Sequence, residues 1–331
     1  MERFALAAAV VLGFALTAAL CSLFVPLRRV LERREQNQQP AQSEQPRPAP
    51  LRAPLWGGLC AAAGTVAAVG VGWLAACVGQ PELLGSEGRL MTRLLTALAG
   101  SLAFGAVGFA EDLARMRSPA ALGLRRDVRL LLEALAAAFV LLLLQAAGCL
   151  PRGLDVPGAG YVLLGSAVPF LWAVLMVALA ECARIAERDE GTVCGAAFVA
   201  MLALMMAEAG LGVPGLAVLP AALAGALVAL LLWAFPPARL GVGCCGSLLA
   251  AGAIGCIPLS LDMTSLTVPL ALPFWAAGGL LAAQLLGAKR TGKPLRCWVK
   301  KHKMSPETVF LCSFALSAVG YVLALALLRW C

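Results

Sequence analysis

Long apolar stretches alternate with short polar ones along the whole chain. Each stretch is close to the roughly 20 residues that an α-helix needs to cross a bilayer. The stretches are continuously apolar over most of their length, whereas the strands of a membrane β-barrel alternate apolar and polar positions. We therefore predict an all-α integral membrane protein of about ten transmembrane helices, at residues 4–27, 56–79, 92–110, 130–147, 163–183, 192–211, 213–234, 244–261, 266–287 and 308–328.

The composition supports the bilayer as the solvent for most of the chain. Apolar residues make up 61% of the 331 positions and charged residues 13%. A soluble domain of this size needs far more polar surface. We predict one membrane domain over residues 1–331, with a polar Gln/Pro/Arg-rich loop at 28–55 and a basic loop at 288–307. The composition of residues 32–54 favours an irregular loop.

The formal charge of +8 could indicate a nucleic-acid partner, but the placement of the charge argues against one. Of the 26 Lys and Arg residues, 21 lie in the alternate loops 28–55, 111–129, 184–191, 235–243 and 288–307. Cytoplasmic loops of membrane proteins carry this excess. We therefore predict a multi-pass membrane protein with both termini extracytoplasmic, and no nucleic-acid partner.

Two clusters of charged residues in the predicted inner loops are candidates for chemistry. Carboxylates gather at Glu111, Asp112, Glu187, Asp189 and Glu190. The loop from Lys289 to Lys303 holds seven basic residues and the only histidine, His302. Acidic groups facing a basic loop could bind a divalent metal together with a phosphorylated ligand. The alternative is that these charges simply fill solvated loops.

Five segments in the inner loops have a recognisable order. They are Pro54-Leu55-Trp56-Gly57-Gly58; Gly108-Phe109-Ala110-Glu111-Asp112-Leu113, continued by Gly123-Leu124, Arg129 and Glu133; Glu181 to Gly191; Gly243-Cys244-Cys245-Gly246-Ser247-Leu248; and Thr291-Gly292-Lys293, followed by His302. Together they resemble the phospho-N-acetylmuramoyl-pentapeptide transferase (MraY) branch of the polyprenyl-phosphate phosphosugar transferases. The glycines among them are expected to serve close helix packing and turns.

The resemblance implies a reaction and a set of site residues. The family moves a phosphosugar from a UDP-sugar onto undecaprenyl phosphate, releases UMP and requires Mg²⁺, in peptidoglycan and cell-envelope synthesis. It implies catalytic roles for Glu111, Asp112 and His302, and metal binding by Glu111, Asp112, Glu187 and Glu190. It implies substrate binding by Arg129, Arg184, Lys293, Lys301 and Lys303. The implied partners are the membrane, a polyprenyl phosphate and, if the protein is active, a UDP-sugar with Mg²⁺; a homodimer is left open.

The sequence departs from the family at chemical positions. Glu111, Glu187 and Glu190 replace aspartates, and Arg184 replaces the second Asn of the fifth-span motif Asn-Ala-Val-Asn-Leu-Thr-Asp-Gly-Leu-Asp-Gly. Cys244 stands where the family has a magnesium-ligating Asp, and a soft thiol is a poor ligand for hard Mg²⁺. The histidine cluster of the family is reduced to His302.

Three function classes follow from these departures. The first is a MraY-like transferase homologue with weakened or lost catalysis, with a divergent active enzyme that uses Glu111, Asp112, Glu187 and Glu190 as its rival. The second is a non-catalytic scaffold or regulator of envelope synthesis that binds a lipid phosphate and needs no cofactor. A secondary transporter is disfavoured, because the predicted spans hold few ionisable residues.

Overall fold

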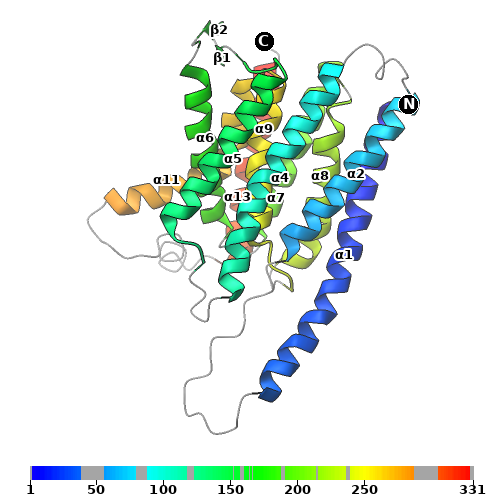
Figure 1. The fold of residues 1–331 in the computed structure, drawn as a ribbon, viewed down its shortest axis with the longest axis vertical. Helices are drawn as coiled ribbons and strands as arrows, with labels where there is room; N and C mark the ends of the chain where they lie inside the picture. The colour runs from blue at the N-terminus through cyan, green and yellow to red at the C-terminus, as the bar shows by residue number, and fades with distance from the viewer. Residues whose placement is uncertain are drawn as a thin grey trace.

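The computed structural model describes residues 2–38, 56–79, 88–117, 123–151, 153–156, 160–163, 165, 167–187, 191–213, 215–235, 239–286 and 305–328. Within them the chain forms a bundle of long helices with a small β-hairpin at one end (Figure 1). The long helices are α1 (Glu2–Gln38), α2 (Gly57–Gly79), α4 (Gly88–Arg117), α5 (Arg126–Ala146), α6 (Ala167–Ala186), α7 (Thr192–Gly210), α8 (Val218–Ala234), α9 (Gly243–Ser260), α11 (Leu272–Leu286) and α13 (Pro306–Leu328). The short elements are β1 (Gly153–Val156), β2 (Gly160–Leu163), the 3₁₀ helix η1 (Thr264–Leu266) and α10 (Thr267–Leu270).

Seven helices of the described residues are long and apolar enough to cross a membrane, namely α1, α2, α4, α6, α7, α9 and α13. Helix α8 is apolar but has 17 residues, and α5 has 21 residues with several charges in its first half. The predicted helical, integral membrane protein is therefore confirmed. Seven of the predicted spans are supported by length and composition, and the count of about ten stays a prediction.

Helix α9 forms the centre of the bundle, and all of its residues are buried. It packs most extensively against α4 and also against α6, α2 and α7. A Cβ atom on Gly108 of α4 would collide with the Cys244 carbonyl, and one on Gly58 of α2 would collide with the backbone of Gly246. Helices in lipid associate mainly through close van der Waals packing, which small residues permit. The prediction that these motif glycines serve close packing is confirmed.

Close packing at glycines also holds α1 against α8 and α2. A Cβ atom on Gly13 would meet the Ala222 carbonyl, and one on Gly225 would meet the Val10 carbonyl. A Cβ atom on Gly64 of α2 would meet the Thr17 side chain of α1. Close approaches at these three glycines thus hold α1 against α8 and α2.

The first predicted polar loop begins later than expected. Helix α1 continues to Gln38, so residues 28–38 of the predicted 28–55 loop are helical. The predicted loop at 111–129 also begins too early, because α4 runs to Arg117 and buries Glu111 and Asp112. Both spans were predicted to end at the first charged residues, but charged residues such as Glu, Lys and Arg are compatible with a continuing helix. In α4, Glu111 and Asp112 are buried with hydrogen-bond partners.

Two other predicted spans differ in shape. The span predicted at 163–183 begins at Ala167, after strands β1 and β2, which pair antiparallel with Val156 opposite Gly160. The span predicted at 266–287 is broken into η1, α10 and α11, with Ala271 between the last two. Pro273, the second residue of α11, lacks the N–H that would continue the preceding turn. Helix α11 crosses the bundle direction and projects from it (Figure 1).

Candidate functional site

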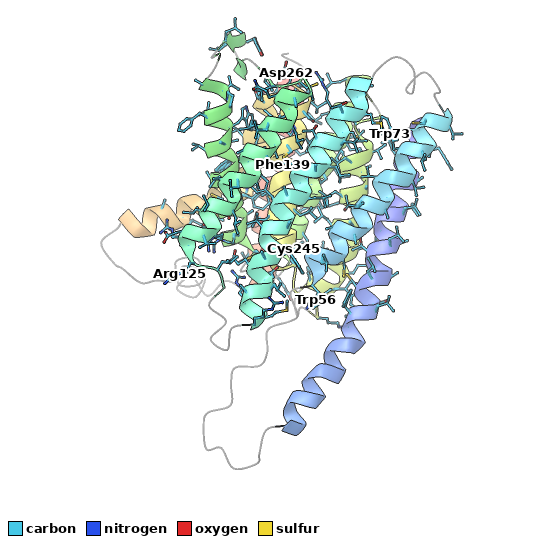
Figure 2. The ribbon with its side chains drawn as sticks, viewed as in Figure 1. Trp56, Trp73, Arg125, Phe139, Cys245 and Asp262 are labelled. Carbon is cyan, nitrogen blue, oxygen red and sulfur yellow. The ribbon has the colours of Figure 1, made fainter. Side chains whose placement is uncertain are left out.

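The ends of four helices meet at the end of the bundle opposite the β-hairpin. They are the C-terminal ends of α4 and α6 and the N-terminal ends of α5 and α9. Figure 2 marks this region with Arg125, which precedes α5, and Cys245, in the first turn of α9. The described charged residues of the predicted site lie here.

Asp112 of α4 accepts two backbone hydrogen bonds from the first turn of α9. The Cys244 N–H donates to Oδ1 at 3.0 Å, and the Cys245 N–H donates to Oδ2 at 2.9 Å. These amides have no partner inside their own helix, and the N-terminus of a helix favours negative charge. Gly243 begins the helix with a φ of +73°, a conformation that glycine adopts without strain. Asp112 therefore caps α9 from a neighbouring helix.

Glu111, the neighbour of Asp112, is held by two arginines. Its Oε1 accepts a hydrogen bond from Arg115 Nη2 at 2.6 Å and lies 3.6 Å from Arg129 Nη1. Its Oε2 is buried and has no hydrogen-bond partner among the described residues. Arg115 also lies 3.8 Å from Asp112. One face of α4 thus carries an arginine one turn after the carboxylate pair.

Arg129 joins α5 to α6. Its Nε donates to Glu181 Oε1 at 2.8 Å and lies 3.9 Å from Glu133 Oε1, one turn further along α5. The second oxygen of Glu181 accepts a short hydrogen bond from Arg184 Nη2 on the same helix. Buried charges of this kind are tolerated when they are paired.

Glu187 and Cys244 complete the group. Glu187 follows α6 and interacts electrostatically with Arg115 and with the thiol of Cys244. The Cys244 side chain is fully buried and also lies in the field of Glu111 and Asp112. Glu111 and Glu187, which are distant in sequence, therefore share one site around Arg115 and Cys244.

The structure brings together Glu111, Asp112, Glu187, Arg129 and Arg184 of the predicted site residues. Glu190, Lys293, Lys301, His302 and Lys303 lie outside the described residues. The catalytic, metal-binding and substrate-binding roles of all these residues stay predictions. Sequence reasoning gave no role to Arg115 and Glu181, although the spacings Glu111/Arg115 and Glu181/Arg184 place each pair on one helix face.

The described residues do not fit a magnesium site. Mg²⁺ takes oxygen ligands in near-octahedral geometry, yet both oxygens of Asp112 accept amide hydrogen bonds and one oxygen of Glu111 is bound to Arg115. Cys244 offers sulfur where the family has a carboxylate. Within the described ranges, no group of three His, Cys, Asp or Glu side chains is arranged to hold a metal ion. Arginine side chains supply the positive charge next to these carboxylates.

Comparison with known proteins identifies the fold that carries this site. Residues 94–262 match the family described as Glycosyl transferase family 4. The chain belongs to this family. The matched region runs from α4 to the end of α9 and so contains every described helix that contributes to the site.

Several relatives share one name. The phospho-N-acetylmuramoyl-pentapeptide-transferase of Mycobacterium tuberculosis (strain ATCC 25618 / H37Rv) is 28% identical over 265 residues, which are 72% of each chain. Proteins of the same name from Desulforudis audaxviator and Synechococcus sp. (strain RCC307) are 32% identical over 170 residues and 30% identical over 212 residues. These matches cover 48% and 63% of this chain and 50% and 55% of the relatives. The resemblance to the MraY branch is confirmed.

Proposed function

We propose that this family 4 protein binds a polyprenyl phosphate in its cytoplasmic site and that its phosphosugar transfer is weakened or lost. The family relationship supports a phosphosugar transferase ancestry, with a UDP-sugar as donor and UMP as the released product. The proposed setting is peptidoglycan synthesis, which the names of the relatives support. On this proposal the chain keeps the lipid-facing scaffold and the phosphate-binding arginines.

The observation that carries the proposal is that the two motif carboxylates of α4 already have hydrogen-bond partners within the protein. Asp112 caps α9, Glu111 is paired with Arg115 and Arg129, and Cys244 stands at the position of the family's metal ligand. Transfer between two phosphate groups requires strong charge neutralisation in the transition state. Carboxylates that already satisfy amides and arginines are poorly placed to recruit a divalent cation for that purpose.

The proposed setting is the bacterial cytoplasmic membrane, with ten spans and both termini extracytoplasmic. Support comes from the distribution of Lys and Arg and from Figure 1, in which α1 begins and α13 ends at the same end of the bundle. Helices α5 and α8 would supply two further spans, and the tenth would be the broken α10–α11 segment, whose second part projects from the bundle. A homodimer is the oligomeric state to test first, by light scattering of the purified protein.

The test is UMP release by the purified full chain from several UDP-sugars and undecaprenyl phosphate, with and without Mg²⁺. We expect little or no release from the wild type, together with retained binding of undecaprenyl phosphate. Restoring the family residue with Cys244→Asp is expected to raise any Mg²⁺-dependent release, because it returns a hard oxygen ligand next to Glu187 and Glu111.

The rival is a divergent active enzyme in which Glu111, Asp112, Glu187 and Glu190 hold Mg²⁺. Robust Mg²⁺-dependent UMP release by the wild type that is lost in Glu111→Ala would establish the rival and end our proposal. The remaining alternative, a non-catalytic scaffold or regulator, is favoured by the complete pairing of Arg129 with carboxylates from three helices. It predicts binding of the lipid phosphate without turnover and normal function after Glu187→Gln.

A further inference from the structure

Glu181 lies between two arginines that come from different places in the chain. Its Oε1 accepts from Arg129 Nε of α5 at 2.8 Å, and its Oε2 accepts from Arg184 Nη2 of α6. Each oxygen of one carboxylate is therefore bound by a different guanidinium group. Such convergence of two arginines on one anion is the arrangement that proteins use for carboxylates and phosphates.

The pair stands at two positions of the fifth-span motif. The family motif has neutral Asn residues at the positions of Glu181 and Arg184, and here both have become charged with opposite sign. A buried charge without a partner destabilises a protein strongly. Glu181 and Arg184 pair with each other, and Glu181 also pairs with Arg129, so none of the three charges is left without a partner. The network is therefore a built feature of the site.

The Glu181 side chain is the most exposed member of this network. It is 22% exposed, whereas the side chains of Arg129 and Arg184 are 9% and 12% exposed. Glu181 is therefore the member of the network with the most freedom to move away from the other two. In addition, Arg184 Nε is buried without a hydrogen-bond partner among the described residues. This N–H group could therefore donate a hydrogen bond to a ligand.

We infer that Arg129 and Arg184 form a binding site for a phosphate monoester and that Glu181 occupies it as an internal competitor. The inference rests on the proposed lipid-phosphate binding and adds its regulation. When the Glu181 side chain rotates away, Arg129 Nε and Arg184 Nη2 lose their acceptors and can donate to a phosphate, while Arg129 keeps its ion pairs with Glu111 and Glu133. The measured affinity is then lowered by the fraction of molecules in which Glu181 is bound, because only the open state binds the ligand.

The test compares full-length variants in nanodiscs of uncharged lipid, with undecaprenyl phosphate as the probe and undecaprenol as the phosphate-free control. Glu181→Gln keeps the shape of the side chain but removes its charge, and we expect it to bind undecaprenyl phosphate about tenfold more tightly. Glu307→Gln, an exposed carboxylate at the start of α13, is the matched control and is expected to leave binding unchanged.

Arg184→Gln is expected to weaken binding, and thermal unfolding reports whether it remains folded. Because that variant leaves Glu181 with one partner fewer, the double variant Glu181→Gln/Arg184→Gln provides a second comparison, with neutral amides at both positions. It is expected to lose the gain seen in Glu181→Gln. Competition by inorganic phosphate in Glu181→Gln would assign recognition to the phosphate group alone, and absence of competition would assign it to the lipid-linked phosphate.

The outcomes separate the inference from the proposed function. If the wild type binds undecaprenyl phosphate and Glu181→Gln binds it no more tightly, the internal competitor is disproved while lipid-phosphate binding stands. If neither protein prefers undecaprenyl phosphate to undecaprenol, the proposed function fails as well. If only Glu181→Gln binds, both are supported.

Discussion

Asp112 illustrates how a residue in a catalytic motif can acquire a structural task. Its two oxygens bind the first free amides of α9, the helix at the centre of the bundle. The motif alone implied a role at a metal ion, whereas the structure shows a cap that links α4 to α9. A carboxylate at a helix N-terminus is stabilised both by hydrogen bonds and by the helix dipole.

Replacing Asp112 by Ala should therefore destabilise the fold itself. The change leaves two buried N–H groups without acceptors, and each such loss costs about 1–3 kcal/mol. We expect a loss of about 3 kcal/mol in the free energy of unfolding, measured by denaturation in detergent micelles, and a smaller loss for Asp112→Asn. Asp127→Ala, at an exposed position in the first turn of α5, is the control and should cost less than about 1 kcal/mol, because it removes only a favourable charge at a helix N-terminus. Equal stability of Asp112→Ala and the control would disprove the capping role.

At the scale of the elements, glycines decide how closely the helices approach α9. Gly57 and Gly58 begin α2, and their N–H groups donate to the carbonyls of Gly241 and Val242 at 3.2 and 2.9 Å, just before α9 begins. The start of α2 is thereby attached to the start of α9. Any side chain at Gly58 would enter the backbone of Gly246.

Gly58→Ala and Gly70→Ala form a matched pair within α2. The first adds a methyl group against the backbone of α9, and the second adds it where nothing lies within 4 Å. We expect Gly58→Ala to lower the free energy of unfolding by about 2 kcal/mol through overpacking. Gly70→Ala should be neutral or slightly stabilising, because Ala favours helix more than Gly. Both are measured by the same denaturation assay, and an equal effect of the two would contradict the close approach of α2 and α9.

At the scale of the whole molecule, the site exists because helix ends from distant parts of the sequence meet at one end of the bundle. Glu111, Arg129, Glu181 and Cys244 come from α4, α5, α6 and α9. With the positive-inside distribution of Lys and Arg, this end is the proposed cytoplasmic face. The β-hairpin at the other end would then be extracytoplasmic (Figure 1).

Reporter fusions test this orientation. Truncated fusions after Arg117 and Glu187 are expected to show cytoplasmic reporter activity, and fusions after Gly79 and Gly148 are expected to show extracytoplasmic alkaline phosphatase activity. Lys and Arg resist translocation across the membrane, which gives the direction of the expected result. Opposite activities, or Arg117 and Glu187 on different sides, would overturn the topology and the proposed cytoplasmic site together.

The sequence by itself determined the helical membrane fold, the motif order and the sites of close packing, because apolar run length and glycine spacing are local properties. It did not predict that α1 extends to Gln38, that the ninth span breaks at Ala271, or that strands β1 and β2 precede α6.

Only the tertiary structure decided which charges pair. Glu181 and Arg129 are 52 positions apart, and Asp112 is 132 positions from Cys244. No local pattern specifies that these groups meet, because the meeting depends on how α4, α5, α6 and α9 pack. The partners of a buried carboxylate decide what it can bind. From the sequence alone, these carboxylates were compatible both with a metal site and with the arginine network that the structure contains.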